Sequence, residues 1–236
     1  MKKILVFCFA FLLAVPSFAD LFDLGGFTTK TKAQADQEFE RLGDLLSQTL
    51  NSGLGDAMNI GFVKGGVEMV VVPFKKEGVL SNAPVSVLPM PYLYGGVSLF
   101  GITPFARVMP LVFLKQNGKT PMFIGGGLGY EIDFTPLFTL MPSATYHTIL
   151  NFDDLKVSSM AFHLQARVNL LLVTAFANAG YSINKYKTEI NLLDATKFEY
   201  SKNMLHASIG AKVLFLYAEL GILPSVSYTV GVSIGF

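Results

Sequence analysis

The chain of 236 residues lacks tryptophan and is poor in cysteine and charge. Its single cysteine is Cys8, and 15% of its residues are charged, against roughly 25% in an ordinary soluble domain. With 18 Lys+Arg and 17 Asp+Glu there is no basic field, so we expect no nucleic-acid partner. A mean hydropathy of +0.48 would suit membrane helices. However, 22 glycines, 11 prolines and 30 phenylalanines and tyrosines favour strands instead.

The N-terminus has the pattern of an export signal. Lys2 and Lys3 precede an apolar run over residues 4–15, and Ser-Phe-Ala at 17–19 supplies small residues for cleavage. The run is shorter than the about 20 residues that a membrane helix needs. We predict a signal peptide over residues 1–19 that is cleaved after about Ala19. The mature chain then has no cysteine, which excludes a disulfide, a thiolate nucleophile and a Cys-ligated metal.

From about Ala57 to Phe236 the apolar pattern has a period of two. Between 159 and 169, apolar residues at even positions alternate with His163, Gln165, Arg167 and Asn169, and residues 171–183 and 205–215 repeat the alternation. These segments run about ten or more residues, as a tilted bilayer crossing requires. We predict an all-β membrane domain over residues 57–236, a closed antiparallel up-and-down transmembrane β-barrel.

The last strand closes on phenylalanine. Its alternate apolar positions are Tyr228, Val230, Val232, Ile234 and Phe236. Together with the export signal, this segment resembles the C-terminal strand signal of bacterial outer-membrane β-barrels. The resemblance implies a bacterial outer-membrane location in a Gram-negative-type envelope. It also implies outer-membrane lipid and the barrel insertion machinery as partners.

Residues 20–56 form a separate N-terminal segment with one predicted amphipathic helix between Ala33 and Leu54. Its apolar face consists of Phe39, Leu42, Leu46, Leu50 and Leu54, and Gly53 and Gly55 end it. With this helix the chain resembles both barrels that carry a periplasmic-side helix and barrels of the fatty-acid-transporter type, which carry an N-terminal plug. We leave both placements open: the helix either fills the lumen or lies at the membrane interface.

Ten strands account for the pattern, although a short ninth strand and Gly65-Gly66 leave eight or twelve open. We expect them at 58–74, 92–102, 105–114, 121–133, 136–150, 156–169, 171–184, 203–214, 217–222 and 226–236. The short connections at 103–104, 135–136, 170 and around 216 are then periplasmic turns. The outward loops are 75–91, 115–120, 151–155 and 185–202.

Polar residues on the inward strand faces are candidates for the lumen lining: Arg107, Glu131, His163, Gln165, Arg167, Asn169, His206, Lys212 and Glu219. Large apolar residues share these faces, so we expect a narrow lumen. Glycines at 125, 127 and 129 permit close approach, and the helix is the candidate to approach them. We expect no cofactor and no metal, because His147 and His163 are two imidazoles without a third ligand.

Two pairs of residues suggest chemistry. His206 and Ser208 resemble the His-x-Ser pair of outer-membrane lipid A deacylases and phospholipases, but here the pair shares the inward face with Lys212. Glu131 and Asp133 suggest an omptin-like acid pair or a metal site, although solvated carboxylates at a strand end are the preferred interpretation. We therefore expect no enzyme, with a His206/Ser208 hydrolase as the alternative.

The function that these patterns favour is passive transport of small or hydrophobic molecules through a narrow or plugged channel. A small hydrophobic ligand is accordingly a candidate partner. One alternative is a structural or surface-binding barrel that transports nothing. The other is a lipid-modifying outer-membrane enzyme.

Overall fold

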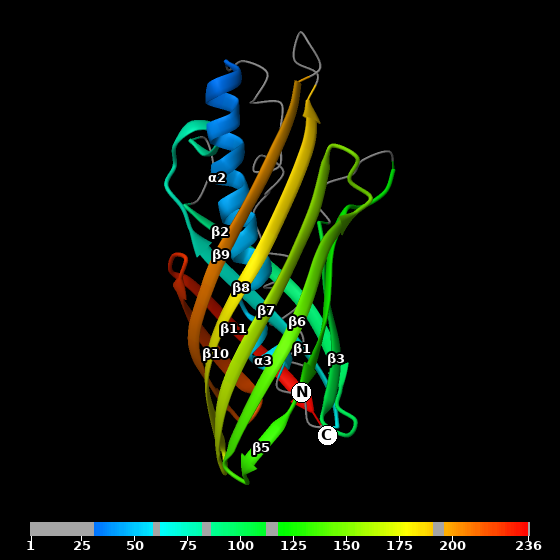
Figure 1. Ribbon diagram of the computed structural model, residues 1–236, viewed down its shortest axis with the longest axis vertical. Helices are drawn as coiled ribbons and strands as arrows, with labels where there is room; N and C mark the ends of the chain where they lie inside the picture. The colour runs from blue at the N-terminus through cyan, green and yellow to red at the C-terminus, as the bar shows by residue number, and fades with distance from the viewer. Residues whose placement is uncertain (1–30, 59–61, 82–85, 112–117, 191–195, 236) are drawn as a thin grey trace, which may run out of the picture.

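The computed structural model describes residues 31–58, 62–81, 86–111, 118–190 and 196–235, and Figure 1 shows a barrel of strands with a helix in it. The predicted signal peptide, residues 1–19, and Phe236 of the predicted insertion signal lie outside the described residues. Within the described ranges no helix is both long and apolar enough to cross a membrane.

Ten antiparallel strands close into the barrel, which confirms the predicted fold and strand number. The elements are β1 (Val63–Pro73), β2 (Val87–Val97), β3 (Ile102–Pro110), β4 (Met122–Tyr130), β5 (Ile132–Thr135), β6 (Phe138–Leu150), β7 (Leu155–Leu170), β8 (Val173–Ile190), β9 (Thr196–Val213), β10 (Leu216–Leu223) and β11 (Ser227–Gly235). Because β4 and β5 both pair with β6 and follow each other along it, they count as one barrel strand. The β1–β11 and β4–β6 ladders complete the ring.

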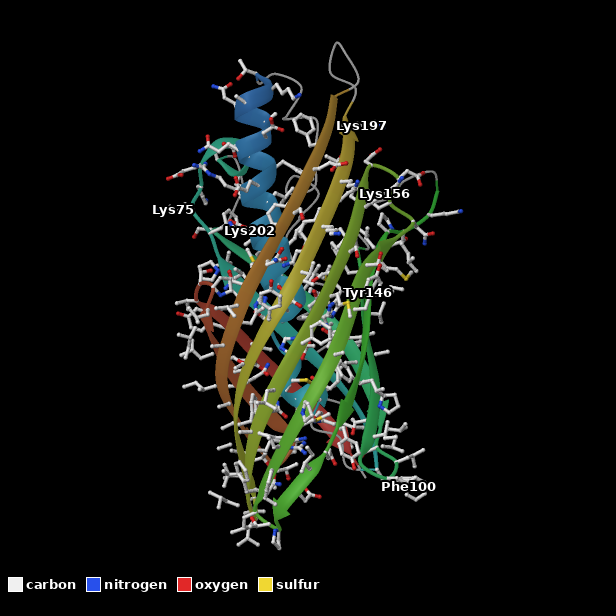
Figure 2. All side chains as sticks on the ribbon, viewed as in Figure 1. Lys75, Phe100, Tyr146, Lys156, Lys197 and Lys202 are labelled. Carbon is white, nitrogen blue, oxygen red and sulfur yellow. The ribbon has the colours of Figure 1, made fainter. Side chains whose placement is uncertain are left out.

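The barrel has two unlike ends. At one end, which we call the turn end, short turns join β2 to β3, β5 to β6, β7 to β8 and β9 to β10. At the opposite end, the loop end, longer connections include residues 74–86 and 111–121. Figure 2 shows Lys75, Lys156 and Lys197 toward the loop end and Phe100 at the turn end.

Two predicted strand boundaries are wrong, one at the turn end and one at the loop end. The first turn lies at residues 98–101, because Gly101 has φ +79° and reverses the chain, whereas Thr103 and Pro104 belong to β3. The second strand begins at Val87, earlier than predicted. Pro89 and Pro91 therefore lie within a strand, whereas the predicted outward loop 75–91 included both.

The predicted loop over residues 185–202 is mostly strand. β8 continues to Ile190 and β9 begins at Thr196. Along these extensions inward Tyr186 and Tyr200 are buried while outward Lys187 and Glu199 are exposed. The outward positions are charged because they lie beyond the apolar part of the wall. With charged residues on the outward face, the segment lacks the apolar outward positions by which the other strands were predicted, so it was predicted to be a loop.

The helix α2 (Lys32–Asn51) and the short helix α3 (Leu54–Met58) lie inside the barrel (Figure 1). α2 begins at the loop end with a capping box, in which Thr31 and Gln34 each accept a hydrogen bond from the other's backbone N–H. It then descends into the lumen, and every residue from Leu45 to Met58 is buried. Burial on all sides of a helix requires the surrounding strands, so the helix occupies the lumen and not the membrane interface.

The predicted contact between the helix and the glycines of β4 is wrong. An added Cβ at Gly125 would lie 2.0 Å from His147 Cδ2, and one at Gly129 would lie 2.0 Å from Met141 Cε. The space over Gly125 and Gly129 is filled by side chains of β6, and the space over Gly127 by Phe105 of β3, so side chains of the wall and not of α2 lie closest to these glycines.

Gly127→Ala is expected to lower the free energy of unfolding by about 1–3 kcal/mol, because overpacking a filled interior forces strain. The added Cβ would lie 2.7 Å from both the Ala144 carbonyl oxygen and Phe105 Cζ. Gly65→Ala is the matched control, since its Cβ would have 3.8 Å to the nearest heavy atom. Urea titration in detergent micelles measures both, and equal losses would contradict this account of the glycine row.

Candidate functional site

The candidate site is the contact between the internal helices and the barrel wall. Its loop-end part is apolar. The predicted apolar face of the helix is buried throughout, with Phe39, Leu42, Leu46, Leu50 and Leu54 each at most 2% exposed. Phe39 lies 6.2 Å from the Phe198 ring of β9, and the Ser47 hydroxyl lies 2.8 Å from the Tyr186 hydroxyl of β8. Hydrophobic burial therefore holds the loop-end half of α2 against the barrel wall.

The polar part begins at the C-terminal end of α2, where Arg107 of β3 meets the helix. Its guanidinium donates to the carbonyl oxygens of Leu50 and Ser52, the latter at 2.8 Å. These carbonyls have no partner within the helix, and the helix dipole places negative charge there. Arg107 thus caps the helix from the barrel wall.

The other contacts of Arg107 hold its charge in the interior. Its Nη1 lies 3.3 Å from the Glu68 carboxylate of β1, and its Nε donates to His147 Nε2 at 3.0 Å. The guanidinium carbon also lies 4.3 Å from the centre of the Tyr92 ring. Because His147 Nε2 accepts this bond, its ring is neutral and its proton is on Nδ1.

A second ion cluster holds α3. Asp56 lies 2.6 Å from Lys64 Nζ and 3.4 Å from Lys212 Nζ, and accepts a hydrogen bond from the Tyr94 hydroxyl at 2.5 Å. Gly55 donates its N–H to Glu219 Oε2 at 3.0 Å and accepts from Gln165 Nε2 at 2.9 Å. Both the side chain and the backbone of α3 are therefore bound to the wall.

The charges of this interior balance. Lys64, Arg107, Arg167 and Lys212 each form an ion pair with a carboxylate, and Glu219 is held by a backbone N–H. Pairing makes buried charge tolerable.

Of these charged groups, sequence analysis missed Asp56, Lys64 and Glu68. Lys64 and Glu68 lie on the same face of an otherwise apolar strand, and this pattern would have identified both as inward residues.

A wall of neutral polar groups on β6, β7 and β8 faces the same interior. In the described part of the chain, five of its side chains have a buried polar atom without a hydrogen-bond partner in the protein: Thr145, His147, His163, Gln165 and Asn178. Each is at most 7% exposed, and Gln165 stands opposite Asn178 in the ladder. Buried polar atoms are nearly always hydrogen-bonded, so this neutral wall holds hydrogen-bonding capacity that the protein itself does not use.

The remaining predicted lumen residues also lie on inward faces. Arg167 pairs with Glu131 at 2.8 Å, and the half-buried Asn169 accepts a hydrogen bond from Thr174 at 3.0 Å. Glu131 and Asp133 are not an acid pair, because Asp133 is exposed and accepts from Thr139 instead.

The structure does not join His206 to Ser208. Both side chains are buried on the inward face, but His206 Nε2 lies 2.6 Å from the hydroxyl of Ser182 across the β8–β9 ladder. His163 has its ring centre 6.4 Å from that of His206. Among the described residues no group of three His, Cys, Asp or Glu could hold a metal ion.

No family model matches this chain, and no curated protein matches it. Among solved structures, the chain is similar to the crystal structure of Ail, the attachment invasion locus protein of Yersinia pestis. The identity is 9%, the match covers 73% of this chain and 96% of that chain, and the TM-score is 0.21.

Proposed function

We propose that this chain is a bacterial outer-membrane β-barrel whose lumen is closed by its own helices, and that small molecules pass when those helices move. The outer wall supports the membrane location. On β8 the outward residues are apolar from Val173 to Ile183, and charge begins at Lys185. The ten steps from Val173 to Ile183, at about 3.3 Å each and tilted by about 40°, span roughly 25 Å, which matches the apolar band of outer-membrane barrels.

The C-terminal strand supports the same location. Tyr228, Val230 and Ile234 point outward and are 51%, 53% and 55% exposed. In water, a row of exposed apolar side chains this long would favour aggregation. Against acyl chains it is the expected wall, and it carries the signal that resembles those read by the barrel insertion machinery.

The observation that carries the transport proposal is the polar attachment of α3. A barrel with a purely structural interior is better stabilised by apolar packing, because buried ion pairs add little net stability. Here the lumen around α3 is lined by charges that hydrate readily once the helix moves. The neutral wall on β6–β8 offers hydrogen bonds without net charge, which favours uncharged polar solutes over hydrophobic ones.

A reversible crosslink tests whether helix movement opens the barrel. The hydroxyls of Ser52, between the helices, and Ser227, on β11, lie 3.1 Å apart, so a Ser52→Cys/Ser227→Cys pair is placed to form a disulfide. In the cysteine-free mature chain we expect the oxidised pair to abolish planar-bilayer conductance and glycerol-driven liposome swelling. A reductant is expected to restore both.

The single variant Ser52→Cys is the control and should behave as the wild type under oxidising conditions. Conductance that is unchanged by the crosslink would show that the helices do not gate the barrel. If neither the wild type nor a chain without residues 20–58 conducts, the barrel is structural and the transport proposal is wrong.

A further inference from the structure

The turns at the turn end of the barrel are unusually apolar. The four turns span residues 98–101, 136–137, 171–172 and 214–215, and none contains a charged residue. We call their large side chains the apolar rim: Leu99, Phe100, Leu137, Leu171, Leu172, Leu214 and Phe215. Phe100 and Leu171 are 99% and 107% exposed, and Figure 2 shows Phe100 projecting from the barrel. Turns that face water instead favour Gly, Asn, Asp, Ser and Pro.

Large apolar residues are also unusual for the backbone conformation of these turns. Phe100, Leu171 and Leu214 have φ of 53°, 44° and 55°, in the left-handed region that favours glycine. In three separate turns, a bulky apolar residue therefore occupies a position where glycine would be less strained. Each of these three side chains is more than half exposed, so burial inside the fold does not account for the residue type.

The rim is continuous with the apolar outer wall. Leu170 precedes the third turn and Val173 follows it, and they are 52% and 36% exposed. Val213 and Leu216 flank the fourth turn in the same way, at 49% and 54%. The loop end differs, because its exposed outward residues include Lys187 and Lys156, the latter labelled in Figure 2.

We propose that the apolar rim is a membrane-anchoring surface, in which the turns lie in the periplasmic-side leaflet against acyl chains and do not project into water. This inference rests on the proposed membrane location. A lipid occupant fits better than a protein, because the rim comes from four turns spread around the ring of strands. A protein partner would cover one side, whereas lipid surrounds the barrel.

The absence of tryptophan from the chain permits a direct test. Phe100→Trp and Leu171→Trp each place a single tryptophan in the rim, in exchange for another large apolar side chain. Leu164→Trp on the outer wall is the lipid reference, and Lys156→Trp at the loop end is the water reference. Each full mature chain is refolded into phosphatidylcholine vesicles, with heat-modifiable mobility as the check on folding.

We expect brominated acyl chains to quench both rim tryptophans several-fold more strongly than iodide does. The same result is expected for Leu164→Trp, and the reverse is expected for Lys156→Trp. If iodide quenches the rim tryptophans as it does Lys156→Trp, while brominated acyl chains quench Leu164→Trp, the rim does not lie in the membrane. That result would overturn the anchoring proposal and leave the membrane-barrel proposal intact. If they become shielded from iodide only in native outer membranes, the rim binds a protein and the lipid proposal is wrong. Iodide quenching of Leu164→Trp would overturn the membrane location itself.

Discussion

Replacing Arg107 by methionine is expected to lower the free energy of unfolding by about 3–5 kcal/mol, the range for breaking a buried ion pair. The side chains of Arg107 and Glu68 are both 0% exposed, so the substitution leaves a carboxylate buried without its cation. It also removes the donor to the carbonyls of Leu50 and Ser52. Urea titration in detergent micelles, followed by circular dichroism, measures the loss.

Lys187→Met is the matched control. It breaks the 2.8 Å ion pair with Glu199, whose two side chains are 58% and 62% exposed. Exposed pairs contribute about 0–1 kcal/mol, so this variant should unfold almost as the wild type does. Adding Glu68→Gln to Arg107→Met should recover part of the stability, because it removes the uncompensated charge. Equal losses for Arg107→Met and Lys187→Met would show that the interior pair does not hold the helix.

Leu164→Arg is expected to impair assembly and to reduce stability by about 2–4 kcal/mol, because it places a cation against acyl chains near the middle of the apolar wall. Leu164 points outward from β7 and is 48% exposed. Refolding yield and unfolding in phosphatidylcholine vesicles measure the effect.

Ser201→Arg makes the corresponding change outside the apolar wall. Ser201 is exposed on β9 and stands opposite Lys185, where charge already occurs. Its refolding yield should equal that of the wild type. If Leu164→Arg assembles equally well, the outer wall at this height does not face lipid, and the proposed membrane location fails.

The direction in which each strand residue points was determined by the sequence itself. Successive residues of a strand point to opposite faces, so the alternation around Leu164 and Gln165 is a local property. The structure accordingly has Leu164 half exposed outside and Gln165 fully buried inside. The same local signal failed at Lys187 and Glu199, where the outward face is charged and the contrast between the faces disappears.

Partners in the lumen were decided only by the tertiary structure. Arg107 was recognised as inward, but its pairing with Glu68 joins β3 to β1 across the barrel interior. Such pairings depend on strand register and on the closure of the ring, which bring together residues that are distant in the chain. Local spacing therefore identified a buried cation without identifying what neutralises it.

The position of the helix was also beyond the reach of the sequence. An apolar stripe shows that one face is buried, and both the lumen and the membrane interface would bury it. The polar face of the helix distinguishes the lumen from the interface, because its residues are buried. Ser47 is hydrogen-bonded to Tyr186, Gln48 to Ser225, and Asn51 to Ser159. Those partners lie more than a hundred residues away, and only the closed barrel brings them around the helix.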